Sequence, residues 1–466
     1  MKKSIILIVY CLISNINNAQ TWSAVGNGVN GRVSCFEIYN DELYVGGQFD
    51  VPGTNMNIGL MKWNGVLFDT LPGTYLLGSF RVEAMEVYNN ELYVGGGFCT
   101  GCSPVASAFE NIAKWDGSSF TSVGTGCSSV VYSMRVFNGN LYVGGDMGLA
   151  GGDTVNHIAR WNGNQWSPVA NGIALNARVF ELEVYNNELY AAGNFNFTDI
   201  NTMCIARWNE TTWNEVGIGG IPGVVYSLGI YNNELYAGGP YFTQAGGVAV
   251  NQIAKWNGIT WSQVGTGIGN NVGHLYSLIE YHDELYAGGE FSIMDGDSIN
   301  SIARYNGSTW NSVGSGVDST TIAIDTIYNF PFLGDTTYYY APHKVSAFIE
   351  FNNELYVGGN FNMIGEVAAH SIAKWSTPVG VEKQQSLISI SVFPNPATNK
   401  ISIEGDFLNE EVQLQLTDML GREIKTGILT KTKTTIDVSE VQEGIYFLIL
   451  QTINATATKK IIVQRR

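Results

Sequence analysis

Hydrophobic and polar residues alternate along most of this chain in short segments that are bounded by Gly, Asn and Asp. One stretch holds four such segments, at residues 224–231, 234–239, 252–256 and 260–265. Side chains that alternate with a period of two point to opposite faces of an extended strand, and Gly, Asn and Asp are typical of turns between strands. The pattern therefore predicts an all-β protein built from short antiparallel strands.

This four-segment unit recurs along the chain. Its most constant parts are the phrase Leu-Tyr-(Val/Ala)-Gly-Gly and, further on, the phrase Ile-Ala-(Lys/Arg)-Trp. Repeats of 46 to 50 residues with four strands each are typical of β-propeller blades. We predict a seven-bladed β-propeller over residues 20–376. The Leu of the first phrase stands at Leu43, Leu92, Leu141, Leu189, Leu235, Leu285 and Leu355.

The two ends of the repeat region complement each other. The last repeat has a third strand near residues 371–375 but no fourth one, whereas residues 21–26 (Thr-Trp-Ser-Ala-Val-Gly) closely match the fourth strand at residues 260–265 (Thr-Trp-Ser-Gln-Val-Gly). We expect the N-terminal strand to complete and close the seventh blade, because this pairing removes the open edge of the sheet.

Two kinds of tight turn join the strands of each repeat. The first is a pair such as Asn-Asn just before Leu-Tyr, and the second is Asn-Gly or Asp-Gly after the third strand. Asn-Gly tolerates the positive φ angles of a type I′ turn, so we predict such turns at the second position. Both turns lie on one face of the propeller. The longer connections therefore share the other face, where binding residues are usually found.

An insertion at about residues 317–343 is the non-repeated feature of the propeller and belongs to the face with the long connections. It is rich in aromatic residues. These side chains either fold back as a local plug or present a surface that binds a protein or a carbohydrate, since Tyr and Phe give large contact area at low entropic cost. The candidate binding residues are Tyr328, Phe330, Phe332, Tyr338, Tyr339 and Tyr340.

Nearly every third strand repeats a Trp and a Lys or Arg. We interpret the Trp residues as packing between blades, and a row of sugar-stacking aromatic residues is the alternative. The basic residues recur together with a Glu just before Leu-Tyr, and we expect the two sets to form ion pairs worth at most about 1 kcal/mol each. The aromatic set is Trp63, Trp115, Trp161, Trp208, Trp256 and Trp375, with Tyr305 in the remaining repeat.

Charge and targeting narrow the range of partners. Residues 1–19 carry Lys2 and Lys3 before an apolar run, which is typical of a signal peptide and predicts export. The repeat region has twelve basic and thirty-one acidic residues, a net charge of about −19. Such a surface repels phosphate backbones and anionic lipid headgroups, which argues against nucleic acid and membrane-surface partners. No later apolar stretch reaches the length of a spanning helix, so we expect no membrane insertion.

Motifs of metal, nucleophile and phosphate chemistry are absent from the sequence, so we expect no cofactor, no metal site and no catalysis. Bound calcium is the alternative at Asp295-Gly-Asp297 or Gly152-Asp153, which we interpret mainly as turns. The thirty-one acidic residues leave open a pair of carboxylates across a central cleft, as a polysaccharide-degrading enzyme would need.

Five cysteines follow the predicted signal peptide, and this odd number does not allow a complete disulfide framework. Cys99 and Cys102 stand in a Cys-Thr-Gly-Cys motif. In an exported protein such a pair is more often a local disulfide than a metal site, and free thiols are the third alternative.

The Gly-Gly pair that ends one strand, with an aromatic residue on the next strand and a Trp on the last, resembles the kelch repeat over about residues 21–376. The long loop after Gly-Gly and the fixed Ile-Ala-(Lys/Arg)-Trp depart from kelch. The resemblance implies a propeller fold. Since kelch-type propellers include both binding modules and an oxidase, it implies no particular function.

A different segment follows a linker at residues 377–387. Its charges are balanced, and alternating stretches within residues 388–466 predict a small immunoglobulin-like β-sandwich. Its motifs, in order, resemble a type IX secretion system type A sorting domain, and an accessory immunoglobulin-like sandwich is the alternative. The motif residues are Pro394, Asn395, Pro396, Asp418, Gly421, Arg422, Gly444 and Tyr446.

The second resemblance implies that the type IX secretion machinery is a partner, that the protein crosses the outer membrane of a Gram-negative cell, and that the tail is removed before release or surface attachment. Both parts together predict an exported, cell-surface or secreted binding module of adhesion type with a protein or carbohydrate ligand. A secreted polysaccharide-degrading enzyme and a structural surface protein without a ligand are the alternatives.

Overall fold

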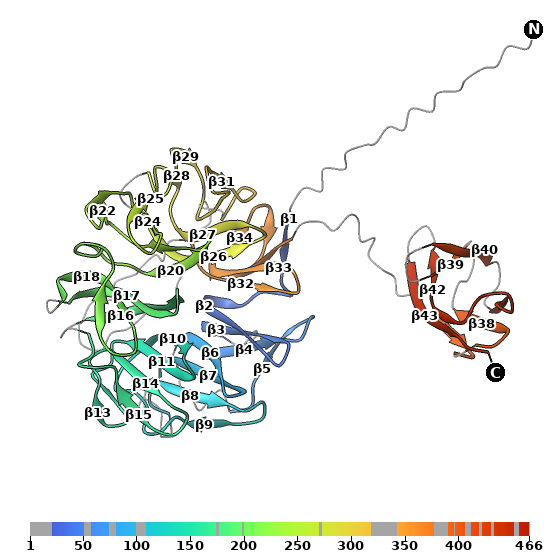
Figure 1. Ribbon diagram of the computed structural model, residues 1–466, viewed down its shortest axis with the longest axis horizontal. Helices are drawn as coiled ribbons and strands as arrows, with labels where there is room; N and C mark the ends of the chain where they lie inside the picture. Colours follow the sequence, from blue (N-terminus) through green and yellow to red (C-terminus); the bar gives the residue numbers. More distant parts are fainter. Residues whose placement is uncertain are drawn as a thin grey trace, which may run out of the picture. The chain divides into compact units, whose positions relative to one another are not determined.

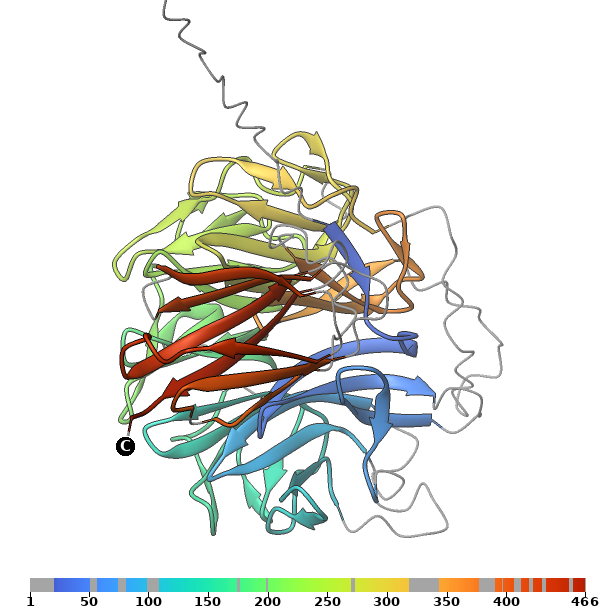
Figure 2. The same ribbon diagram turned by 90° about the vertical axis from the view of Figure 1, so that its right-hand side faces the viewer.

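The computed structural model contains two compact units, an N-terminal unit at Gln20–Thr377 and a C-terminal unit that includes Pro378–Arg466. The regular elements of the described residues are β-strands (Figures 1 and 2). The structure describes residues 21–50, 57–73, 81–98, 109–173, 177–197, 200–269, 273–317, 343–376, 390–395, 397–405, 412–418, 422–429, 433–451 and 456–465.

The described part of the N-terminal unit contains seven four-stranded antiparallel sheets, numbered in chain order. Sheet 1 consists of β2 (Asn30–Tyr39), β3 (Glu42–Asp50), β4 (Asn57–Trp63) and β5 (Phe68–Thr70), and sheet 2 of β6 (Arg81–Tyr88), β7 (Glu91–Gly97), β8 (Ile112–Trp115) and β9 (Phe120–Ser122). Sheet 3 consists of β10 (Val131–Phe137), β11 (Asn140–Gly145), β14 (Ile158–Trp161) and β15 (Trp166–Pro168), and sheet 4 of β16 (Arg178–Tyr185), β17 (Glu188–Phe197), β18 (Thr202–Trp208) and β19 (Trp213–Glu215).

The last three sheets repeat the same strand order. Sheet 5 consists of β20 (Ser227–Tyr231), β21 (Glu234–Gly238), β24 (Ile253–Trp256) and β25 (Trp261–Gln263), and sheet 6 of β26 (His274–Tyr281), β27 (Glu284–Glu290), β30 (Ile302–Tyr305) and β31 (Trp310–Ser312). Sheet 7 consists of β32 (Lys344–Phe351), β33 (Glu354–Asn360), β36 (Ile372–Ser376) and, from the other end of the unit, β1 (Thr21–Ala24).

The connections between second and third strands carry small two-stranded hairpins in sheets 3, 5, 6 and 7. Asp295 and Gly296 have φ angles of 55° and 89° and lie between the paired residues Met294 and Asp297. The Asp295-Gly-Asp297 motif is therefore a turn, as predicted. The hairpins are β12 (Leu149–Ala150) with β13 (Asp153–Thr154), β22 (Gln244–Ala245) with β23 (Val248–Ala249), β28 (Ile293–Met294) with β29 (Asp297–Ser298), and β34 (Met363–Ile364) with β35 (Val367–Ala368).

The first strands of the seven sheets form a ring. Strand β2 contacts β6, and the contacts continue through β10, β16, β20, β26 and β32, which in turn contacts β2. In Figure 1 the sheets follow one another around a common centre, from blue through green to orange. Seven hydrophobic clusters fill the gaps between neighbouring sheets. The first strands therefore surround one central space.

The N-terminal strand β1 pairs with β36 of the last repeat, as the sequence predicts. The register is antiparallel, with Thr21 opposite Ser376 and Trp22 opposite Trp375. The indole nitrogen of Trp22 donates to the carbonyl oxygen of Val313 in sheet 6 at 3.2 Å. The fourth-strand Trp residues of sheets 3, 4 and 5 make the same kind of bond to the preceding sheet. Strand β1 therefore takes the role of a fourth strand in packing as well as in pairing.

The repeated third-strand Trp residues pack between sheets, as predicted, and are buried. Each stacks on the aromatic residue of the adjoining fourth strand, as Trp161 does on Trp166 with 5.1 Å between ring centroids. The indole nitrogen of Trp161 also donates to the hydroxyl of Tyr93 in sheet 2 at 3.2 Å. Because these rings are buried, a row of exposed sugar-stacking Trp residues on the third strands is excluded.

The predicted ion pairs between third and second strands are present wherever the Glu occurs. Lys255 Nζ, for example, lies 2.7 Å from Glu234 Oε2. Arg160 has Asn140 in the equivalent position and its Nε donates instead to Ser167 Oγ at 3.2 Å. The remaining pairs are Lys62–Glu42, Lys114–Glu91, Arg207–Glu188, Arg304–Glu284 and Lys374–Glu354.

The turn geometry corrects one prediction. The two-residue turn at Asn40 and Asp41 has φ angles of 53° and 60°, so the left-handed turns lie between first and second strands. After the third strand, Trp63 pairs with Phe68, which leaves a four-residue loop. Asn64 Oδ1 accepts two backbone N–H groups of this loop, at 2.9 and 2.8 Å. The predicted type I′ turn at Asn-Gly is wrong, because the Asn side chain supplies the turn's hydrogen bonds.

The C-terminal unit has two antiparallel sheets around one core. The core includes Ile401 and Ile403 from one sheet and Leu414, Leu416 and Leu448 from the other. The first sheet consists of β37 (Ile390–Phe393), β38 (Lys400–Gly405) and β41 (Lys433–Asp437), and the second of β40 (Glu423–Leu429), β39 (Val412–Asp418), β42 (Gly444–Gln451) and β43 (Thr456–Val463).

Candidate functional site

A cavity of about 500 Å³ lies at the centre of the ring and is lined by residues from all seven first strands. Each first strand begins at the face with the long connections and runs toward the face with the tight turns. Residues early in these strands therefore lie at the mouth of the cavity on the long-connection face, and residues later in the strands lie deeper.

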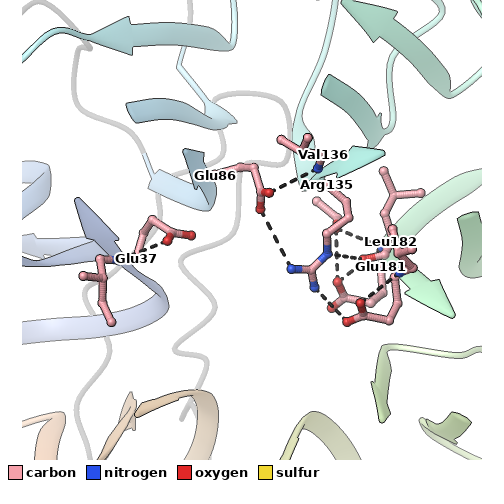
Figure 3. A network of polar contacts seen from close by, with 10 residues as sticks. Glu37, Glu86, Arg135, Val136, Glu181 and Leu182 are labelled. Atoms are coloured by element: carbon pink, nitrogen blue, oxygen red, sulfur yellow. Dashed lines mark hydrogen bonds and ion pairs between the residues drawn. The ribbon is translucent and has the colours of Figure 1, made fainter. Parts of the chain in front are cut away.

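A polar network occupies the deeper part of the cavity (Figure 3). Arg135 on β10 donates from Nη2 to Glu183 Oε2 of β16 at 2.8 Å, and its Nη1 lies 3.9 Å from Glu86 Oε2 of β6. Glu86 Oε1 also accepts the backbone N–H of Val136 at 3.1 Å. Because β6, β10 and β16 belong to successive sheets, Arg135 links three neighbours of the ring.

Two further glutamates border this network. Glu181 Oε1 accepts a hydrogen bond from Ser133 Oγ at 3.1 Å and one from its neighbouring backbone N–H, that of Leu182, at 3.2 Å. Glu37 Oε1 on β2 accepts the backbone N–H of Ile38 at 3.1 Å. Burial raises the pKa of Glu37 to about 7, an effect that the charge of Glu86 reinforces. Burial likewise raises the pKa of Glu181 to about 7, so both side chains change charge near neutral pH.

Aromatic side chains from four consecutive sheets line one side of the mouth. The ring centroids of Tyr132 and Phe180 are 5.3 Å apart, those of Phe180 and Tyr226 are 5.2 Å apart, and those of Tyr226 and Tyr276 are 5.4 Å apart. All four side chains line the cavity and are half-buried, so part of each ring stays accessible. We call these four residues the aromatic arc.

A repeated irregularity of the strands places three of the four residues of the aromatic arc, and the fourth, Tyr226, directly precedes β20. The register with the second strand shifts between Val131 and Ser133, and a corresponding shift surrounds Phe180 and Tyr276. A β-bulge leaves one residue unpaired and re-aims its side chain, here toward the central space. Sheets 1, 2 and 7 have the same shift but place Ser34, Glu83 and Ser346 at this position.

A histidine fixes the end of the aromatic arc. His274 Nδ1 shares a hydrogen bond of 2.9 Å with the Tyr276 hydroxyl, and its Nε2 shares one of 2.8 Å with the hydroxyl of Tyr241. Burial, assisted by the charge of Lys344, lowers the pKa of His274, which favours the neutral ring that can donate at one nitrogen and accept at the other. Tyr241 is 62% exposed and extends the aromatic surface onto the long-connection face.

Basic side chains stand around the same mouth, near the starts of first strands. Glu83 Oε1 accepts from Arg32 Nη2 at 2.8 Å and from Arg81 Nε at 2.7 Å. Arg178 is 53% exposed, and its Nε lies 3.5 Å from Asp146 Oδ2. Lys344 Nζ lies over the ring of Tyr276, 4.8 Å from its centroid. The mouth therefore joins cationic and aromatic surface.

A second recess, of about 720 Å³, lies between sheets 7 and 1. Its lining includes Trp63, Phe351 and Lys374, and it is on the side of the tight turns. Lys374 there is bound to Glu354 at 2.7 Å. Three of its four charged lining residues, Glu42, Glu354 and Lys374, belong to the repeated ion pairs, so the central cavity is the stronger candidate site.

Several predicted site residues lie outside the described residues. They are the aromatic residues of the insertion (Tyr328, Phe330, Phe332, Tyr338, Tyr339 and Tyr340), the Cys99 and Cys102 pair, the signal peptide at 1–19, and Pro396 and Gly421 of the sorting motif. The described cysteines Cys35, Cys127 and Cys204 are free thiols. No group of three or more His, Cys, Asp or Glu side chains in the described ranges is placed to hold a metal ion, and no helix there is long and apolar enough to span a membrane.

The described sorting-motif residues act in the two-sheet fold of the C-terminal unit. Asp418 accepts the backbone N–H and the Nε of Arg422, at 2.9 and 2.7 Å, which holds the start of β40 against β39. Asn395 Oδ1, next to Pro394, accepts the backbone N–H of Ile462 at 2.8 Å. The motif positions Gly444 and Tyr446 begin β42, and the Tyr446 hydroxyl donates to the carbonyl of Gln442 at 2.8 Å. These residues therefore join segments that are distant in the sequence.

Sequence reasoning missed the residues of the central cavity. A signal for them exists, because first strands of different repeats carry different residues at two inward positions. One position reads Ser, Glu, Tyr, Phe, Tyr, Tyr, Ser from sheet 1 to sheet 7, and the other reads Glu, Glu, Arg, Glu, Gly, Ile, Ile. Variation at such positions within a repeat marks sites that the repeated packing does not require.

Comparisons with known proteins assign parts of both units. Residues 391–464 match the family described as "Secretion system C-terminal sorting domain". Residues 171–336 match the family described as "Rax2 C-terminal beta propeller domain". Neither of these two families is the kelch repeat. No curated protein matches the chain.

Similar solved structures are distant. PorZ, described as an essential bacterial surface component of the type-IX secretion system of Porphyromonas gingivalis, has 14% identity and a TM-score of 0.39, with 96% of this chain and 70% of that chain covered. The extracellular domains of a one-component and a hybrid two-component system from B. thetaiotaomicron have 10% identity and TM-scores of 0.23 and 0.24. Those two matches cover 96% of this chain and 97% and 91% of the others, respectively.

The sorting-domain match settles where the protein acts. Its range covers nearly all of the described C-terminal unit. The chain thus combines a β-propeller with a sorting domain and is exported through type IX secretion to the cell surface or the extracellular space.

Proposed function

We propose that the chain is a seven-bladed, kelch-like β-propeller, closed by its N-terminal strand, that binds a carbohydrate at the mouth of its central cavity after export. The ring of contacts among the seven first strands and the pairing of β1 with β36 support this architecture. The function is binding, with release or surface attachment following removal of the tail. The type IX machinery is the partner during export.

The aromatic arc is the observation that carries the proposal. Its four rings form a continuous surface with centroid spacings of 5.2 to 5.4 Å. Sugar rings present C–H faces that pack on aromatic rings, and their hydroxyl groups need polar partners nearby. The recessed position of the arc, with Tyr241 and His274 at one end, favours a slender chain of sugars over the broad surface of a folded protein.

A second candidate function is polysaccharide cleavage. Glycoside hydrolysis uses one carboxyl group as an acid and another as a nucleophile or base. Glu37, Glu86, Glu181 and Glu183 line the cavity, and burial raises the pKa of both Glu37 and Glu181 to about 7. A carboxyl group that is still partly protonated at neutral pH is suited to donate a proton to a leaving group.

A carbohydrate array probed with the full chain tests both candidates, when each mixture is also analysed for released oligosaccharides. Phe180→Ala and Tyr226→Ala interrupt the aromatic arc, and we expect each to weaken binding about tenfold. Ile259→Ala is the matched control, because Ile259 is 80% exposed on a tight turn of sheet 5. We expect it to bind like the unaltered protein.

The outcomes separate the candidates. Binding that both arc variants lose, without released products, supports the binding module. Products that disappear in Glu181→Gln establish the enzyme instead. Binding that Phe180→Ala and Tyr226→Ala leave unchanged, or a failure to bind any carbohydrate, contradicts the proposed site.

A further inference from the structure

The basic residues of the N-terminal unit are distributed unevenly. Seven of its twelve Lys and Arg residues occupy the repeated third-strand position. The other five all stand on first strands around the central axis. Arg135 lies in the cavity, and the remaining four, which we call the basic rim, stand at its mouth. The basic rim consists of Arg32, Arg81, Arg178 and Lys344.

The basic rim contrasts with the rest of the unit. The repeat region carries a net charge of about −19, so a neutral or positive area on it is exceptional. Three carboxylates among the described residues interact with the four cations of the rim, through ion pairs or through the effect of charge on a pKa. Glu83 is shared by two arginines, Asp146 lies 3.5 Å from Arg178, and the charge of Lys344 lowers the pKa of Glu290, which burial raises. Within the part of the mouth that the structure describes, these cations outnumber these carboxylates, in contrast to the negative repeat region.

The basic rim and the aromatic arc form one site. Burial raises the pKa of Tyr276, and the charge of Arg32 lowers it, although Arg32 belongs to sheet 1 and Tyr276 to sheet 6, with sheet 7 between them. Arg81 and Arg178 act in the same way on Tyr132, whose pKa burial also raises. Arg32 Nε is buried and has no hydrogen-bond partner among the described residues. Cationic donors thus converge on the aromatic rings.

The layer beneath the mouth sets how far an anion can enter. Glu37 follows Arg32 by five residues on β2, which is about 16 Å along an extended strand. Glu37, Glu86 and Glu183 share that layer with Arg135, and Glu181 lies two residues nearer the mouth, so a negative group is attracted at the mouth and repelled below it.

We propose that the bound carbohydrate is an acidic polysaccharide, whose carboxylate or sulfate groups pair with the basic rim while its sugar rings pack on the aromatic arc. This inference rests on the proposed carbohydrate-binding function and names its ligand class. Arginine suits both anionic groups, because its planar fork donates two parallel hydrogen bonds to their oxygens.

Matched pairs of polymers test the inference on the full chain. Polygalacturonate is compared with its methyl ester, and dextran sulfate with dextran, by titration calorimetry in 50 mM and 500 mM NaCl. We expect at least one acidic polymer to bind tenfold or more tightly than its neutral counterpart at low salt, and to weaken at high salt. The two pairs distinguish carboxylate from sulfate.

Charge variants separate a site from a general charge effect. Arg178→Gln and Lys344→Gln each remove one cation of the basic rim, and we expect each to weaken binding of the acidic polymer threefold to tenfold. Lys255→Gln removes the same charge from a third strand and is the control, with no expected change.

Each result bears on the inference. Equal binding of acidic and neutral polymers, or equal losses in Lys255→Gln and Arg178→Gln, overturns the acidic ligand and leaves carbohydrate binding intact. Binding confined to neutral carbohydrates of the array does the same. Failure to bind any polymer or any carbohydrate of the array overturns the proposed function as well.

Discussion

Replacing Glu37 by Gln is expected to stabilise the protein at alkaline pH and to leave its stability in mild acid nearly unchanged. Burial in the central cavity raises the pKa of Glu37 from 4.5 to about 7. Between these pH values the folded protein keeps a proton that the unfolded chain has lost. Stability therefore falls as the pH rises through this range, because folding then requires an ionised Glu37 to be buried near Glu86.

The size of the effect follows from the pKa change. A pKa raised from 4.5 to about 7 corresponds to about 3 kcal/mol of unfolding free energy, of which roughly 2 to 3 kcal/mol is lost between pH 5 and pH 8. Gln has nearly the shape of protonated Glu, and its side-chain oxygen can accept the backbone N–H of Ile38, which lies 3.1 Å from Glu37 Oε1. The Glu37→Gln variant lacks the charge and so avoids this loss.

Urea unfolding of the full chain at pH 5, 6.5 and 8 measures the prediction. The difference in unfolding free energy between Glu37→Gln and the unaltered protein should grow by roughly 2 to 3 kcal/mol from pH 5 to pH 8, with an unchanged urea dependence. Glu350→Gln, at an exposed position of β32, controls for the removal of one negative charge. A difference that is the same at all three pH values would refute the reasoning, because it would show that folding does not change the titration of Glu37.

Three further predictions concern the repeated architecture, and urea unfolding measures each. Glu210→Gly should stabilise the protein by about 1 kcal/mol, because Glu210 has a φ of 73° where other repeats carry Gly, and a loss of stability would contradict this. Trp22→Ala should cost about 3 to 5 kcal/mol, since Trp22 is buried against Trp375 at 4.7 Å; a cost below 1 kcal/mol would show that β1 contributes little. Glu234→Gln should cost less than about 1 kcal/mol because the pair with Lys255 is partly exposed, and a cost above 2 kcal/mol would assign the pair a larger role.

The sequence predicts the sheets well because packing imposes the same demand on every repeat. Each third strand needs a large aromatic ring between sheets, so the Trp of Ile-Ala-(Lys/Arg)-Trp recurs. The fourth strand that pairs with each third strand can also be predicted, even in sheet 7, where it is β1 from the other end of the unit. The turns between third and fourth strands are harder to predict. There the side-chain oxygen of Asn64 replaces the backbone bond of a two-residue turn, a choice that composition does not reveal.

The candidate site was not predicted, because its residues are the ones that differ between repeats. Phe180 reads as an ordinary strand residue until the bulge aims it at the central space, and Tyr226 reads as the residue before a strand. The pKa of Glu181 depends on burial and on Arg135, which belongs to a different sheet. Such properties arise from the ring arrangement, and one repeat considered alone does not contain them.

The pairing of β1 with β36 also sets the order in which the unit can fold. Thr21 and Ser376 are partners across more than 350 residues of chain, so their encounter carries a large loop-closure entropy unless the intervening sheets have already assembled. Sheet 7 is therefore expected to complete late, after the other sheets have brought the two ends together. During synthesis β1 emerges long before its partner β36. The β1–β36 pair can therefore form only after all repeats between the two strands have been synthesised.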